Sequence, residues 1–129
     1  MITLRSLLNK KNIEYKKQNM SYLDEWFNEI IDVPLSKLLV GDIARLIRQQ
    51  VFIYEILPYA LNILSSDPLA GDSYDGQLIS SLATLTKGDI EKCSFNFNEI
   101  NMIINKIDKS LLSSELLSDI QKINSFSSM

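Results

Sequence analysis

The sequence has no histidine and a single cysteine among its 129 residues. Histidine is the most common general base near neutral pH and the most common zinc ligand, so its absence removes the simplest route to acid–base catalysis and to a zinc site. One cysteine cannot form a disulfide within the chain, which agrees with a reducing compartment. Because no histidine can activate its thiol, we expect Cys93 to be a small residue packed in or near the core.

Long apolar runs and clustered glycines are missing as well. No stretch approaches the ~20 apolar residues that span a membrane, and Arg5, Lys10 and Lys11 interrupt the N-terminal segment where a secretion signal needs an unbroken apolar core. The four glycines stand alone, so the sequence contains no glycine-rich loop of the kind that holds phosphate groups. These absences predict a cytoplasmic protein with no membrane segment and no nucleotide cofactor.

Apolar residues recur at intervals of three and four, the spacing of one face of an α-helix. The pattern predicts helices within residues 21–31, 40–50, 51–64, 76–85, 96–107 and 113–123. Hydrophobic residues make up 46% of the chain, enough to form a core. We therefore expect an all-α fold, a single compact helical bundle of five to six helices. It would form one domain over residues 1–129, with a basic N-terminal segment at 1–19 and a frayed tail at 125–129.

Residues 51–64 are apolar on nearly every side, so they predict the central and most buried helix. Pro58 lies inside this stretch, where it either kinks the helix or starts a new one. The residues that we expect in the core, here and in the helix of residues 76–85, are Phe52, Ile56, Leu61, Leu64, Leu78 and Leu82.

Polar residues beside the apolar stripes predict where the helices begin and end. The helix of residues 21–31 is expected to begin at Ser21, with Asp24 and Glu25 in its first turn, where the helix dipole favours acids. We expect Asp75 to cap the helix of residues 76–85, and Gly88 to close that helix in a left-handed conformation. Two later helices are expected to start at Asn96, with Glu99 completing a capping box, and at Ser113 or Ser114.

The net charge of −3 is unevenly distributed. Residues 1–19 carry five basic residues and one acid, whereas residues 20–90 carry ten acids and four basic residues. A central acidic region disfavours nucleic acid, whose phosphates need clustered lysine and arginine, and favours a protein partner with a basic surface. The competing interpretation is that acids on solvated helix faces only keep the protein soluble.

Three aspartates gather in "DPLAGDSYDGQLI", namely Asp67, Asp72 and Asp75. A calcium-binding EF-hand needs oxygen ligands at alternating positions and a closing glutamate, and this stretch has neither. Carboxylates paired for acid–base work would need a second signal that fixes their geometry, and each aspartate has a structural explanation in a turn or a helix cap. We therefore predict no catalytic, metal-binding or cofactor-binding residue, and no enzymatic activity.

Four stretches between residues 34 and 85 carry a resemblance to a known family. They are "PLSKL" at 34–38, "VGDIARLIRQ" at 40–49, "LPYALNIL" at 57–64 and, above all, "DPLAGDSYDGQLISSL" at 67–82. In these stretches the chain resembles one of the immunity protein families of bacterial contact-dependent growth inhibition (CDI) systems. The chain departs from that pattern at Gln77, where an acid often stands, and its N-terminal quarter and tail have no counterpart.

The resemblance implies a non-enzymatic cytoplasmic protein that binds and neutralises the C-terminal toxin domain of a cognate large exoprotein. Several such toxins are nucleases, and a nuclease needs a basic surface for phosphate, which an acidic inhibitor complements. The resemblance supplies no catalytic residue. It also implies that the motif at 67–82 is chiefly architectural, because each immunity protein must vary its contact surface to match one toxin.

Charge and aromatic side chains coincide in two short segments, and such mixtures are typical of binding hot spots. Trp26 shares a stripe with Leu23 and Ile30, so packing in the core is its competing interpretation. The alternative function for the whole chain is a non-catalytic helical adaptor or regulatory subunit unrelated to any toxin. The predicted partner-binding residues are Asp24, Glu25, Trp26, Glu29, Asp67, Asp72, Tyr74 and Asp75.

Overall fold

The computed structural model describes residues 1–17 and 19–127. Within them the chain forms eight α-helices and two short 3-10 helices, with no strand. The all-α prediction is confirmed, but there are more helices than the five to six expected. None of the helices in this part of the chain is long and apolar enough to cross a membrane. The chain divides into two compact units, residues 1–38 and 39–129.

The first unit contains two α-helices and one 3-10 helix. Thr3 begins the first of them with a capping box, in which its side chain accepts a hydrogen bond from the backbone of Ser6 at 3.1 Å and Ser6 reaches back to the backbone of Thr3. This helix has only seven residues and was not predicted. The elements are α1 (Leu4–Lys10), α2 (Tyr22–Ile30) and η1 (Leu35–Lys37).

Helix α2 begins after Ser21, as the sequence predicts, and Ser21 caps it by accepting a hydrogen bond from the backbone of Asp24 at 3.2 Å. The chain just after α2 is bonded to α1, because the backbone N–H of Arg5 donates to the carbonyl of Ile31 at 3.1 Å. An ion pair between the side chains of Arg5 and Asp32 at 2.6 Å strengthens this connection. The Arg5 guanidinium therefore lowers the pKa of the Asp32 carboxyl.

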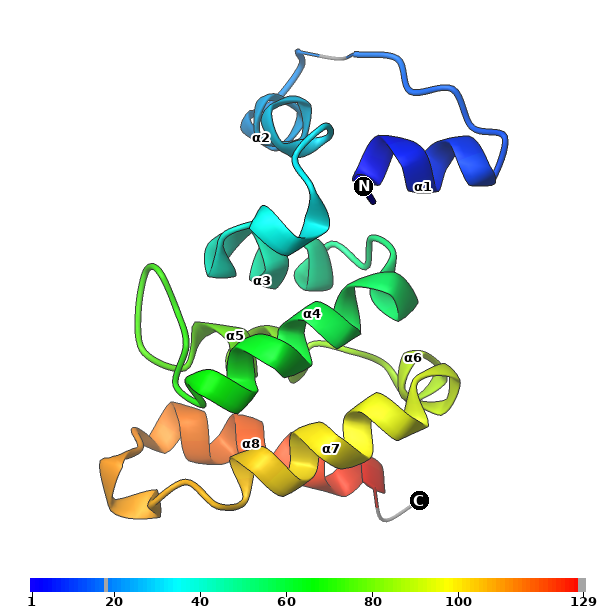
Figure 1. Cartoon of the computed structure of the whole chain (residues 1–129). Coiled ribbons are helices and arrows are strands. Elements are labelled where there is room, and N and C mark those ends of the chain that lie inside the picture. The colour runs from blue at the N-terminus through cyan, green and yellow to red at the C-terminus, as the bar shows by residue number, and fades with distance from the viewer. Residues whose placement is uncertain (18, 128–129) are drawn as a thin grey trace. The chain divides into compact units, whose positions relative to one another are not determined.

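The second unit is built around α4, which packs against α3 on one side and α7 on the other (Figure 1). Helix α3 also contacts α5, and α8 contacts both α5 and α7, so the helices share one core. The elements are α3 (Val40–Arg48), α4 (Ile53–Ser66), α5 (Gln77–Leu82), α6 (Lys87–Lys92), α7 (Ser94–Ile104), η2 (Lys109–Leu111) and α8 (Ser114–Ser127).

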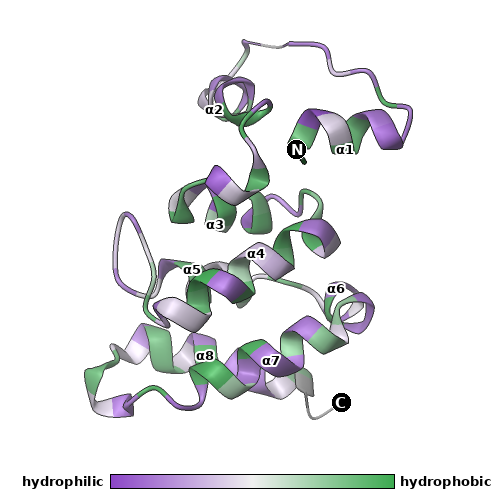
Figure 2. Cartoon of the chain, viewed as in Figure 1, coloured by the Kyte–Doolittle hydropathy of each residue, from purple (hydrophilic) through white to green (hydrophobic). Residues whose placement is uncertain are grey.

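The core of the second unit follows the predicted apolar stripes for the most part. Figure 2 shows hydrophobic and hydrophilic residues alternating along the helices, as expected when each helix buries one face. Phe52 stays partly exposed because it precedes α4 in a left-handed conformation, with φ of 50°, and so falls outside the helical stripe. Leu61 is also partly exposed. The other four predicted core residues are buried, namely Ile56, Leu64, Leu78 and Leu82.

Several predicted helix boundaries are wrong. Asp75 does not cap α5, because the residue before the helix is Gly76, which takes a left-handed φ of 81°. Gly88 does not close that helix, since it lies inside α6. The start of α6 is fixed by a capping box between Thr86 and Asp89, which was not predicted. The six-residue α6 and the seven-residue α1 account for the additional helices.

For the last two α-helices, one predicted start is wrong and the other is confirmed. Asn96 is inside α7, which begins directly after Cys93, so the predicted capping box with Glu99 does not form. Ser113 caps α8 as predicted, because its hydroxyl accepts a hydrogen bond from the backbone of Leu116 at 3.2 Å. Helix α8 extends to Ser127, and so includes the first part of the tail expected to fray, while residues 128–129 lie outside the described residues.

Candidate functional site

The predicted partner-binding residues of the second unit lie in the connection between α4 and α5, which we call the acidic loop (residues 67–76). Asp67 begins it as the C-cap of α4. Its Oδ1 accepts a hydrogen bond from the backbone of Leu69 at 3.2 Å, and its carbonyl accepts one from the backbone of Ala70 at 3.0 Å. Asp67 therefore forms the turn by which the chain leaves the helix.

Asp72 connects the acidic loop to the first turn of α3. Its Oδ2 accepts a hydrogen bond from the backbone N–H of Gly41 at 2.7 Å. The first N–H groups of a helix have no partner within the helix, and an acid near them also interacts favourably with the helix dipole. Asp72 therefore caps α3 from a position 31 residues away. This bond joins the "VGD" and "GDSYDG" motifs that carry the family resemblance.

Gln77 supports the loop from the opposite end. Its Oε1 accepts two backbone hydrogen bonds, from Asp72 at 2.8 Å and from Ser73 at 3.2 Å. A glutamate in this position would present an equivalent oxygen, so the acid common in the related pattern is compatible with the same contacts. The neighbouring Gly71 has no room for a side chain, because a Cβ there would lie 1.9 Å from the backbone oxygen of Tyr74.

Tyr74 and Asp75 project at the tip of the loop. The hydroxyl of Tyr74 accepts a hydrogen bond from Nη2 of Arg48 at 3.2 Å, and 49% of the tyrosine surface remains exposed. Asp75 is exposed and makes no hydrogen bond or ion pair with any of the residues that the structure describes. The tip of the loop thus has the side chains most available to a partner.

The predicted residues of the first unit all lie on α2. Glu25 and Glu29 are exposed, while Asp24 and Trp26 are half-buried. The carboxylate of Asp24 accepts a hydrogen bond from the backbone of Met20 at 3.2 Å. Trp26 meets Phe27 edge-on, with ring centroids 6.2 Å apart, so it is neither fully buried nor fully exposed. The eight predicted residues therefore fall into two groups, one on each unit.

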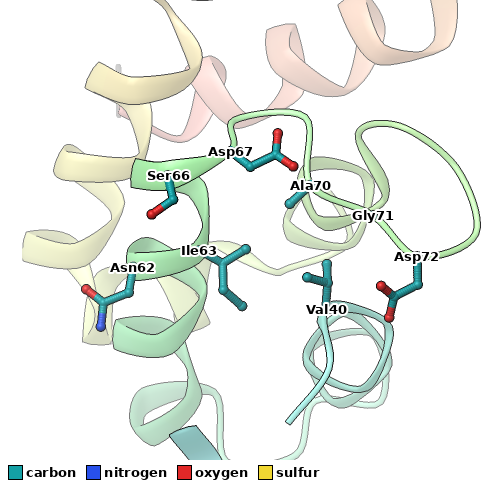
Figure 3. A pocket seen from close by; sticks show the side chains of 8 residues that line it. All are labelled: Val40, Asn62, Ile63, Ser66, Asp67, Ala70, Gly71 and Asp72. Carbon is teal, nitrogen blue, oxygen red and sulfur yellow. The ribbon is translucent and has the colours of Figure 1, made fainter. Parts of the chain in front are cut away.

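A pocket of about 460 Å³ opens beside the acidic loop. Asn62 and Ser66 lie on the same face of α4 because they are four residues apart, and this polar pair on a largely apolar helix was the only sequence signal for the pocket. The lining residues, shown in Figure 3, are Val40, Asn62, Ile63, Ser66, Asp67, Ala70, Gly71 and Asp72.

Cys93 lies at the junction of α6 and α7 and is buried, which confirms that it packs in the core. Burial raises the pKa of its thiol, and the nearby carboxylates of Asp89 and Glu55 raise it further. A thiol of this kind is a poor nucleophile near neutral pH. Across the described part of the chain, no three side chains of histidine, cysteine, aspartate or glutamate gather in a way that would hold a metal ion.

A family model described as CDI immunity proteins matches residues 7–100. This region contains both groups of predicted residues and the pocket, and it extends well beyond the stretches that carry the resemblance in the sequence. No curated protein matches the chain.

Proposed function

Because this chain belongs to the family of CDI immunity proteins, we propose that it binds and neutralises the C-terminal toxin domain of one cognate exoprotein. The family match over residues 7–100 is the observation that carries the proposal. It favours this function over a helical adaptor or regulatory subunit unrelated to a toxin. We also propose, as the sequence predicts, that the protein acts in the cytoplasm.

Neutralisation by this protein would be stoichiometric binding rather than chemistry. The single thiol is buried with a raised pKa, and two of the three acids of the loop, Asp67 and Asp72, are engaged in a turn and a helix cap. The inhibitor would instead cover the toxin surface that its substrate needs. If the toxin is a nuclease, that surface is basic, and acids on the inhibitor would speed association.

The proposed contact residues are the eight predicted from the sequence. The structure shows that some of them are free to contact a partner, while others also stabilise the fold. Glu25 and Glu29 on α2 are exposed, as are Tyr74 and Asp75 at the loop tip, so these four have side chains accessible to the toxin. A tyrosine surrounded by charged residues is often a hot spot for protein binding. The remaining four would contribute shape and charge while they also hold structure, namely Asp24, Trp26, Asp67 and Asp72.

Growth protection tests the proposed function directly. The toxin domain encoded by the reading frame immediately upstream would be expressed from an inducible promoter, with and without this protein. We expect growth arrest without it and normal growth with it, together with co-purification of the two proteins. A toxin domain that neither binds this protein nor is neutralised by it would contradict the proposal.

Charge reversal tests the proposed contact surface. A joint Glu25→Lys and Asp75→Lys variant should keep its fold, because neither carboxylate bonds to any described residue. We expect its association rate with the toxin domain to fall about tenfold at low salt, and the salt dependence of association to weaken. The matched control is a joint Glu91→Lys and Glu115→Lys variant, which makes the same charge change at two other exposed positions. Equal losses in both variants would show that net charge, and not these positions, governs association.

A further inference from the structure

We propose that the pocket beside the acidic loop receives a basic side chain, an arginine or a lysine, that projects from the toxin domain. This inference rests on the proposed function and adds the chemistry by which the partner is recognised. The pocket belongs entirely to the second unit, so it does not depend on how the two units are arranged.

The walls of the pocket combine apolar and polar surface in the way that a long basic side chain requires. Val40, Ile63 and Ala70 supply apolar contacts suited to the methylene stem of an arginine or lysine. Asn62 and Ser66 on α4 add a carbonyl oxygen and a hydroxyl that accept hydrogen bonds. No lysine or arginine lies among the lining residues, so the pocket contains no cation of its own.

The two carboxylates of the pocket each keep one oxygen available. Asp67 uses Oδ1 for the backbone of Leu69, and Asp72 uses Oδ2 for the backbone of Gly41. The second oxygen of each accepts no hydrogen bond from any described residue. These internal bonds fix the carboxylates in place before a partner arrives, so little conformational entropy is lost when a cation binds them. Figure 3 shows both side chains at the rim of the pocket.

The end of α4 adds a second preference for positive charge. This helix ends at Ser66 and Asp67, so the negative end of its dipole lies at the pocket. Its last turn contains no basic residue, and Pro68 has no N–H with which to satisfy a free helix carbonyl. A guanidinium or ammonium group from outside would supply both the charge and the donors that are missing here.

Blocking the pocket from within tests the inference. In an Asn62→Lys variant, the pocket wall would carry a positive charge that repels the basic side chain of the toxin. The control is Ser65→Lys, which adds the same charge at an exposed α4 position outside the pocket. With the toxin domain encoded immediately upstream as the probe, we expect Kd to rise about tenfold or more for Asn62→Lys and less than about threefold for Ser65→Lys.

Removing the charge while keeping the architecture gives an independent test. Asparagine has a carbonyl oxygen that can still accept the backbone hydrogen bond at either position, so a joint Asp67→Asn and Asp72→Asn variant should unfold at nearly the wild-type temperature. We expect its Kd for the same toxin domain to rise about 10- to 100-fold and to depend less on salt. A Glu91→Gln and Glu115→Gln variant, with the same loss of charge elsewhere, should bind like the wild type.

The outcomes separate this inference from the proposed function. If wild-type protein binds the toxin domain and the pocket variants bind equally well, the pocket inference is wrong and the proposed function stands. If the wild-type protein does not bind at all, both are wrong. If the Asn62→Lys and the double asparagine variants both weaken binding while their controls do not, the pocket is a recognition site for positive charge.

Discussion

The acidic loop and helix α2 each contain three acidic residues but use them differently. In the loop, Asp67 and Asp72 each accept a hydrogen bond from a backbone N–H, and Gln77 accepts two more. On α2, Glu25 and Glu29 are exposed, and their carboxylates accept no hydrogen bond from any described residue. Two of the three acids in the loop thus support the backbone, whereas two of the three acids on α2 remain available to solvent.

This difference shows why a recognisable motif need not be the contact surface. A side chain that supports the backbone cannot be exchanged without cost, whereas an exposed side chain can vary to suit one partner. The loop motif "DPLAGDSYDGQ" therefore identifies the fold, and its two tip residues Tyr74 and Asp75 are the positions where variation is cheapest. Changes in the two regions should accordingly have unequal effects on stability.

Gly71→Ala should have the largest effect. The added Cβ would lie 1.9 Å from the backbone oxygen of Tyr74, a distance that no real contact reaches, so the loop must move. We expect a loss of about 3 kcal/mol or more in the free energy of unfolding, measured by urea denaturation.

Gly88→Ala is the matched control for Gly71→Ala, because the nearest atom to an added Cβ there is 3.9 Å away and the residue is inside α6. It should be neutral or add up to about 1 kcal/mol. Equal stabilities would mean that the loop is not closely packed.

Gln77→Leu should have the next largest effect, because two backbone N–H groups in the loop lose their acceptor. We expect a loss of about 1–3 kcal/mol in the free energy of unfolding. Gln77→Glu keeps an oxygen in place and should cost less than about 1 kcal/mol. A leucine variant as stable as the glutamate variant would show that these hydrogen bonds are replaced by water at no cost.

Asp72→Ala should have a moderate effect, because it removes the cap on α3. We expect a loss of about 0.5–2 kcal/mol in thermal or chemical unfolding. Glu25→Ala, on the exposed face of α2, should change stability by less than about 0.5 kcal/mol. If the two variants are equally stable, the contrast between loop and helix does not hold.

The smallest expected effect on stability comes from the ion pair between Arg5 and Asp32 in the first unit. The pKa of Asp32 is lowered from about 3.8 by its hydrogen bond to Arg5. A lowered folded-state pKa means that the carboxylate contributes stability above its unfolded pKa, and that this contribution is lost as the pH falls through the folded value. Titration of Asp32 by nuclear magnetic resonance should give a pKa below the unfolded value, and Arg5→Gln should restore it. An unchanged pKa in that variant would show that Arg5 is not the cause.

The sequence predicts the helices better than their connections. The helices at 22–30, 40–48 and 53–66 follow directly from apolar spacing, and Ser21 marks the first of them. The errors arise where two local signals compete. Gly88 is typical of a helix end, but the Thr86 and Asp89 capping box beside it places it in the first turn of a new helix. Spacing alone does not decide between these possibilities.

The candidate site was predictable only in part. The acids of the loop are visible in the sequence, but the bond from Gly41 to Asp72 joins residues 31 positions apart and depends on how α3 packs against α5. The pocket likewise needs α4 and the first turn of α3 to meet the loop. Long-range packing of this kind leaves no local pattern, so the roles of Asn62 and Ser66 appear only in the folded chain.

The thiol of Cys93 can report when the junction between α6 and α7 opens. The only thiol of the chain is sealed between α6 and α7 with a raised pKa, so a thiol-reactive dye can label it only in molecules where this junction has separated. The labelling rate under native conditions therefore measures how often that separation occurs, without any engineered probe. The same shielding keeps mild oxidants from the thiol of the folded protein, so oxidation of Cys93 should require the same separation.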